Sequence, residues 1–223
     1  LAPLGAAATN PPALPLVFLH AFDFVRVSGA DVLLMIDGRF HRLDRLPLRL
    51  NGARRWFTRY SPEPFIVRWN PAHDGSLAPI GDDAVATYDL APRDGFTEIR
   101  AMRARLGTRE IVVTFAPTLP QLTALRDDAE ATGAFRIAAD SSVGVVTGTW
   151  SVRRAGDTVR VVATPDGGWT PNEPNRTVRL IYRLGGAFTV WPASYRFEGV
   201  VTRHDDGSWR MRSRWERVAV TPP

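Results

Sequence analysis

The residue types that most often bind metals or transfer protons are sparse in this chain. Its four histidines, none of which shares the spacing of a metal-binding pair with another, are His20, His41, His73 and His204. The segments around His73 and His204 also carry aspartates, which could help to hold a cation. Asp is nevertheless far commoner in such loops as a turn former than as a metal ligand. The sequence therefore predicts no metal site.

The sequence also excludes several kinds of catalytic nucleophile and lacks the common cofactor-binding motifs. The chain has no Cys and no Lys, which excludes thiol nucleophiles, Cys-ligated metals and Schiff bases. It has no GxSxG elbow, P-loop or GxGxxG fingerprint, so no cofactor is predicted. A Ser-His-Asp triad or a pair of glycosidase carboxylates would depend on three-dimensional geometry that no motif here specifies. Catalytic residues are left unassigned, and the pattern favours a non-enzymatic role.

Arginine supplies all 28 positive side chains, against 23 acidic ones, for a net charge of +5. GC-rich coding would produce this composition, but Arg also binds carboxylates and phosphates in a bidentate way that Lys cannot. Two segments interleave Arg with aromatic residues, 54–60 and 209–215. In the second, a period of two places Trp209 and Trp215 opposite Arg212, which is typical of an ordinary strand. In the first, Arg55 and Phe57 share a face, which favours a contact surface.

Loops that carry aromatic rings are further candidate contacts. Residues 169–175 form a Pro-interrupted stretch that begins with Trp169, and residues 188–195 contain Trp191 followed by Pro192. Rings placed at such turns can dock on a partner. The candidate partner-contact residues are therefore Arg54, Arg55, Trp56, Arg59, Trp169, Trp191, Arg210 and Arg212.

The elements that would position these residues are mainly strands. Apolar residues recur with a period of two between Gly, Pro and Asp punctuation, which predicts antiparallel β-structure. Thr118-Leu119-Pro120-Gln121 resembles a helix-capping box, and Gly133 would end that helix. Residues 70–83 are predicted as a loop and 176–184 as a strand. The expected fold is mainly β, an antiparallel sandwich or flattened barrel of roughly ten strands, with one short helix at about 119–132.

Two C-terminal hairpins allow their registers to be predicted. A four-residue loop at 154–157 would set Val152 opposite Val159. In the last hairpin, a three-residue loop places Gly207 where a left-handed bulge residue is needed. The register that follows pairs Phe197 with Trp215, Val201 with Met211, Glu198 with Arg214 and Arg196 with Glu216.

The organisation of the chain gives a hypothesis about its setting. Residues 1–16 are rich in Ala and Pro and carry no charge, which predicts an arm or linker, including one left by a removed signal or anchor. Residues 17–223 are predicted to form a single β-rich globular domain. The apolar run at 13–24 is too short to span a bilayer. We expect an extracytoplasmic location, periplasmic or secreted, in a bacterial-type cell, with a cytoplasmic location as the alternative.

The leading functional hypothesis is a non-enzymatic binding or accessory domain. It would dock on a partner protein or a membrane-associated assembly through exposed Arg and aromatic residues. The alternative is a barrel-type carrier or enzyme that acts on a small apolar molecule. Nucleic-acid binding is least favoured, because acidic residues are dispersed among the arginines.

Overall fold

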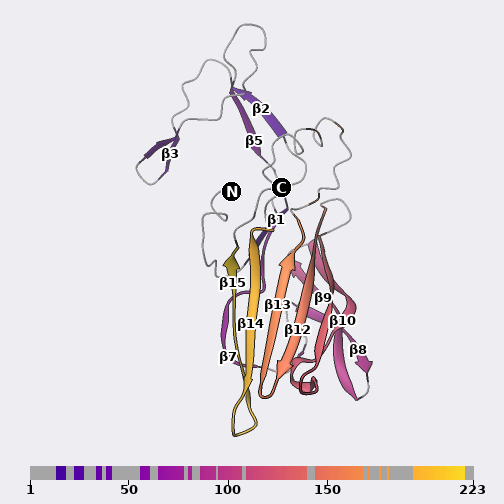
Figure 1. The fold of residues 1–223 in the computed structure, drawn as a ribbon. Helices are drawn as coiled ribbons and strands as arrows, with labels where there is room; N and C mark the ends of the chain where they lie inside the picture. Colours follow the sequence, from indigo (N-terminus) through magenta and orange to yellow (C-terminus); the bar gives the residue numbers. More distant parts are fainter. Residues whose placement is uncertain are drawn as a thin grey trace. The chain divides into compact units, whose positions relative to one another are not determined.

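A computed structural model gives the fold (Figure 1). The chain divides into two compact units, one made of Leu1–Phe18 with Ile66–Pro223 and the other of Leu19–Phe65. Among the residues that the structure describes, side chains are described from Asn70 onward, except those of Leu106, Arg109 and Ala139. The structure describes residues 14–18, 23–27, 34–36, 39–41, 56–60, 65–77, 80–81, 86–93, 95–106, 109–139, 144–167, 170, 176, 180 and 193–218.

The N-terminal third contributes three strand pairs. In the smaller unit, β2 (Asp23–Val27) pairs with β5 (Trp56–Tyr60), and β3 (Leu34–Ile36) pairs with β4 (Arg39–His41), both antiparallel. A further pair joins β1 (Leu14–Phe18) to β6 (Phe65–Trp69). The predicted N-terminal arm and the predicted single domain stay predictions.

A nine-stranded antiparallel sheet dominates the larger unit and confirms the mainly β prediction (Figure 1). Strands β8 to β15 follow one another in the sheet in chain order, and β7 joins at the far side of β15. The sheet is not closed, because β7 and β8 are its two edges. The strands are β7 (His73–Ser76), β8 (Ala86–Arg93), β9 (Phe96–Leu106), β10 (Arg109–Leu119), β11 (Glu130–Ala139), β12 (Val145–Ala155), β13 (Thr158–Pro165), β14 (Tyr195–Arg203) and β15 (Trp209–Arg217).

The two faces of the sheet differ as strict alternation requires. On β12, Val146, Trp150 and Val152 are buried, whereas Thr147 and Thr149 between them are exposed. The inner face forms the core, with Trp215, Tyr195, Phe135 and Ile137 among its fully or almost fully buried side chains. The outer face carries mainly Thr and Arg. Burial of one face and exposure of the other fixes the register of each strand, because a slip of one residue would exchange them.

Glycines let large rings cross the inner face between β11 and β12. Gly133 pairs with Trp150, and Gly148 pairs with Phe135. A Cβ added at Gly133 would lie 2.6 Å from the Trp150 ring, and one at Gly148 would lie 2.1 Å from the Phe135 ring. Each ring therefore occupies the space above the glycine of the neighbouring strand, which packs this part of the core closely.

The helix predicted at about 119–132 is wrong in extent. Only Leu122–Ala124 is helical, as one 3₁₀ turn, while Leu119 ends β10 and Glu130 begins β11. The Thr118 hydroxyl donates a hydrogen bond to Glu98 instead of capping a helix. Gly133 does not end a helix. A glycine is required at this position because the Trp150 ring lies where a Cβ would be. Strands β10 and β11 then form one antiparallel pair, so the segments before and after this connection share one sheet.

The predicted register of the last hairpin is confirmed. Phe197 pairs with Trp215 and Val201 with Met211, and Gly207 has the required positive φ of 82°. The Asp206 carboxylate accepts a hydrogen bond from the Ser208 side chain and one of 2.9 Å from Ser208 N–H, and these bonds lower the Asp206 pKa. The ion pairs differ from expectation, because they form along each strand, between Arg196 and Glu198 and between Arg214 and Glu216.

Three local predictions need correction. The hairpin of β12 and β13 pairs Val152 with Val161 rather than with Val159, because its turn is the two-residue Gly156-Asp157, with Gly156 at a φ of 58°. The shift is two residues, so the same side chains still face inward. Strand β7 lies within residues 70–83, which were expected to be a loop. In the predicted strand at 176–184, Arg176 and Leu180 are helical.

Candidate functional site

Four of the eight predicted contact residues, Arg54, Arg55, Trp169 and Trp191, lie outside the described residues. Trp56 and Arg59 belong to β5, where they pair with Val27 and Phe24, and the contact surface at 54–60 stays a prediction. Arg210 and Arg212 lie on the exposed side of β15, whereas Trp215 is fully buried on the other side. The expected separation of Arg from aromatic residues on this strand is therefore confirmed.

The two arginines of β15 have different surroundings. Arg210 Nη2 lies 3.0 Å from the Asp74 carboxylate of β7, and both side chains are more than half exposed. Arg212 lies directly opposite Asp74 on one side and Val200 on the other. Within the described part of the chain, no carboxylate forms an ion pair with Arg212.

Arg212 continues a line of arginines across the outer face. Arg153 of β12 pairs with Arg160 of β13, which pairs with Val200 of β14, which pairs with Arg212. Neighbouring strands are about 4.8 Å apart, so the three arginines span roughly 15 Å. All three are exposed, and we call them the arginine row.

Two of the described carboxylates flank the arginine row without forming ion pairs with it. Glu130 faces Arg153 at one end and Asp74 faces Arg212 at the other, but neither carboxylate forms an ion pair with the row in the described structure. Arg153 and Arg160 are directly opposite like charges, an arrangement that destabilises a strand pair. The row therefore presents a positive surface that an anionic partner would neutralise.

A shallow, hydroxyl-lined hollow of about 320 Å³ lies one step along the strands from the row. Thr132, Ser151 and Val162 share one line across β11, β12 and β13, immediately next to the line that holds Arg153 and Arg160. Thr149 and Thr164 add two more hydroxyls. These groups can donate hydrogen bonds to the same partner that the arginines attract.

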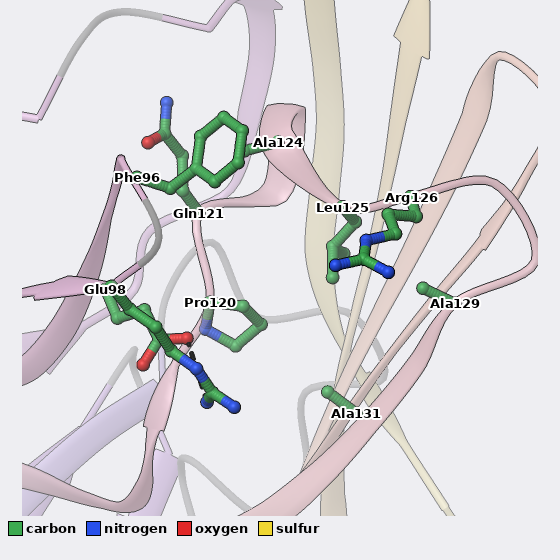
Figure 2. Close-up of a pocket in the computed structure, with 10 residues that line it drawn as sticks. Phe96, Glu98, Pro120, Gln121, Ala124, Leu125, Arg126, Ala129 and Ala131 are labelled. Atoms are coloured by element: carbon green, nitrogen blue, oxygen red, sulfur yellow. Dashed lines mark hydrogen bonds and ion pairs between the residues drawn. The ribbon is translucent and has the colours of Figure 1, made fainter.

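A second, larger hollow of about 460 Å³ lies where the β8–β9 hairpin meets the connection between β10 and β11 (Figure 2). Figure 2 shows Phe96 and Gln121 at one side and Leu125 with Arg126 at the other, with Pro120, Ala129 and Ala131 between and below them. Most of this lining is apolar. Phe96 at the rim is 50% exposed, and it is therefore available for contact.

Metal-ligating side chains are scattered in the described part of the chain. It contains no group of three His, Asp or Glu side chains that could hold a metal ion. His73 and His204 are both exposed, and His73 Nε2 lies 3.3 Å from the Ser76 carbonyl oxygen. Among the described residues, no helix has the length and apolar character needed to cross a membrane.

Sequence reasoning missed most of both candidate sites. Arg153 and Arg160 join Arg212 only through the register of four strands, and the predicted register of β12 and β13 was two residues off. Correct recognition of Gly156-Asp157 as a two-residue turn would have paired these arginines. The larger hollow was missed because its connection was expected to be a longer helix.

Comparisons with known proteins add no assignment. No family model matches the chain, and neither a curated protein nor a solved structure matches it.

Proposed function

We propose that the protein is a non-enzymatic binding domain that docks through the arginine row on a partner protein whose surface presents carboxylates. The observation that carries this proposal is the line of Arg153, Arg160 and Arg212, exposed and without an ion-pair partner in the described structure. Guanidinium groups bind carboxylates in bidentate geometry, and Arg is enriched in protein interfaces.

The surroundings of the row favour a protein over a nucleic acid. Val200, between Arg160 and Arg212, is 37% exposed and adds an apolar contact to the charged ones. The large rings of the neighbouring strands, such as Trp150, Phe197 and Trp215, are buried on the inner face. Rings that could stack on bases are thus directed away from the row.

The cellular setting is part of the same proposal. An extracytoplasmic location, with the partner in a membrane-associated assembly, is supported by the uncharged, Ala- and Pro-rich composition of residues 1–16. A stretch of this composition is a typical linker between a domain and its attachment.

Binding to poly-L-glutamate tests the docking surface. The test variant carries Arg153→Gln, Arg160→Gln and Arg212→Gln. The matched control removes the same charge from three exposed arginines of β9 that form ion pairs, through Arg100→Gln, Arg103→Gln and Arg105→Gln. We expect the test variant to lose at least about tenfold in affinity, or about 1.4 kcal/mol, and the control to lose much less.

Three outcomes would contradict the proposal. Equal losses in the two variants would show that only the net charge matters. A lack of binding to poly-L-glutamate at low ionic strength would remove the acidic partner. Tighter binding of duplex DNA or of phosphatidylserine vesicles, with the same dependence on the row, would assign the surface to a nucleic acid or a membrane.

A further inference from the structure

The larger hollow is independent of the arginine row, since it is lined by β8, β9, the β10–β11 connection and the first residues of β11 (Figure 2). Ala131 pairs with the fully buried Val152, so the hollow opens from one end of the inner face.

Arg154 fixes the connection that forms one wall. Its Nη1 donates a hydrogen bond of 2.6 Å to the Leu125 carbonyl, and its guanidinium lies 5.4 Å from the centre of the Trp209 ring. The Asp127 carboxylate accepts a hydrogen bond of 2.6 Å from Gly156 N–H. The connection is thus tied to the hairpin of β12 and β13 at several points, and the wall is formed before any ligand arrives.

The polar groups on the opposite side are already satisfied. Gln121 Oε1 accepts a hydrogen bond from Thr97 N–H, and its Nε2 donates to the Thr123 hydroxyl. The Glu98 carboxylate accepts from Thr118 and forms an ion pair with Arg93 at 3.3 Å. Only 12% of the Glu98 side chain is exposed, so it offers little to a cationic ligand.

Arg126 is the charged group of the lining that forms no ion pair among the described residues, whereas Arg93 is paired with Glu98. It is exposed, it lies beside Leu125 in Figure 2, and within the described residues it has no ion pair or side-chain hydrogen bond. The other surfaces within reach are apolar, from Pro120, Ala129 and Ala131. A volume of about 460 Å³ lies in the range of small-molecule sites.

We propose that this hollow binds a small amphipathic carboxylate. Its apolar body would lie against Leu125, Ala129 and Ala131, with Phe96 covering the mouth, and its carboxylate would pair with Arg126. Charge selects the head group, because the carboxylate of Glu98 is neutralised by Arg93, whereas the charge of Arg126 is not. Burial of the tail supplies most of the affinity, and the guanidinium supplies the preference for an anion.

Isothermal titration calorimetry with decanoate as the probe tests the proposal, with 1-decanol and decylamine as comparisons. We expect decanoate to bind at least about tenfold more tightly than either, since a charge-assisted hydrogen bond is worth more than a neutral one. Arg126→Gln should remove this preference while leaving weak binding of the tail. Arg136→Gln, at an exposed arginine on the outer face of β11, is the matched control and should leave the affinity within about twofold.

A second variant tests the apolar wall. Ala129→Phe places a ring in the hollow and should abolish decanoate binding, and its far-ultraviolet circular dichroism should match that of the parent protein. If this variant does not fold, alanine-methyl NMR of the parent protein replaces it, and decanoate should shift the methyl signals of Ala124, Ala129 and Ala131.

The proposal is overturned if decylamine or 1-decanol binds as tightly as decanoate, if Arg126→Gln has no effect, or if none of these alanine methyl signals shifts. The variant that lacks the arginine row should bind decanoate normally. That comparison separates a failure of this inference from a failure of the docking proposal.

Discussion

The crossing of Phe135 over Gly148 predicts a large penalty for one added methyl group. A Cβ at Gly148 would lie 2.1 Å from the Phe135 ring and 2.5 Å from the Thr164 carbonyl oxygen. Ordinary contact begins at 3.4 Å, so the ring would have to retreat by about 1.3 Å through a closely packed core. The carbonyl belongs to β13, whose pairing with β12 limits its movement. The added group is thus held between a ring and a backbone atom.

We expect Gly148→Ala to lower the free energy of unfolding by about 3 kcal/mol, at the upper end of the usual cost of overpacking. For a chain of this length that corresponds to a fall in Tm of about 6–12 °C. Urea unfolding followed by tryptophan fluorescence, together with differential scanning calorimetry, measures both quantities. Gly167→Ala is the control, because a Cβ there would meet nothing within 4 Å, and it should change stability by less than about 0.5 kcal/mol.

A double-mutant cycle identifies the cause. Phe135→Leu removes the ring atoms that the new methyl group would meet, so Gly148→Ala should cost at least about 1 kcal/mol less in that background. Both glycine variants share the entropic effect of replacing glycine in the unfolded chain, and the control accounts for it. Equal stabilities of Gly148→Ala and Gly167→Ala, or strict additivity with Phe135→Leu, would refute the reasoning.

Two further predictions concern side chains that the fold has placed in special surroundings. Arg154→Met should remove the hydrogen bond to Leu125, lower the unfolding free energy by about 1–3 kcal/mol and speed tryptic cleavage after Arg126; unchanged cleavage would show that Arg154 does not hold the connection. Burial raises the pKa of Tyr195 above its usual 10.0, with a smaller opposing effect from Arg217. The neutral phenol is therefore favoured in the folded state, and its contribution to stability is complete below pH 10.0 and is lost as the pH rises through the folded pKa. Urea unfolding at a series of alkaline pH values should show a smaller decline for Tyr195→Phe than for the parent protein, and equal declines would contradict this assignment.

The two C-terminal hairpins show what the sequence could and could not predict. In the last hairpin, turn chemistry at Gly207, apolar pairing of Phe197 with Trp215 and opposite charges on the outer face all favour one register, which is confirmed. In the hairpin of β12 and β13, two registers that differ by two residues both keep Val152 and Trp150 inside. Apolar pattern cannot separate them, and only the turn decides.

The candidate sites depend on the register between strands and on tertiary contacts, which the sequence of a single strand does not specify. From the sequence of its own strand, Arg153 is an ordinary exposed residue. Its place in the arginine row is apparent only when the register sets Arg160 opposite it. The capping-box pattern at Thr118 predicted a helix of about 119–132, and tertiary contacts prevent that helix from forming. The Thr118 hydroxyl reaches Glu98 on β9 and Leu119 still belongs to β10, so no helix begins there, and only Leu122–Ala124 forms a 3₁₀ turn.

The order of strands in the large sheet also bears on how the chain folds. From β8 to β15 every strand pairs with its neighbours in sequence, and most of these pairs close only short connections, the longest being residues 166–194 between β13 and β14. The pairing of β7 with β15 is different, because Asp74 and Arg210 are separated by 136 residues. The entropy of closing that loop is best offset when the rest of the sheet already holds β15 in place. We therefore expect β7 to add last, after the pairing of β8 to β15 is complete.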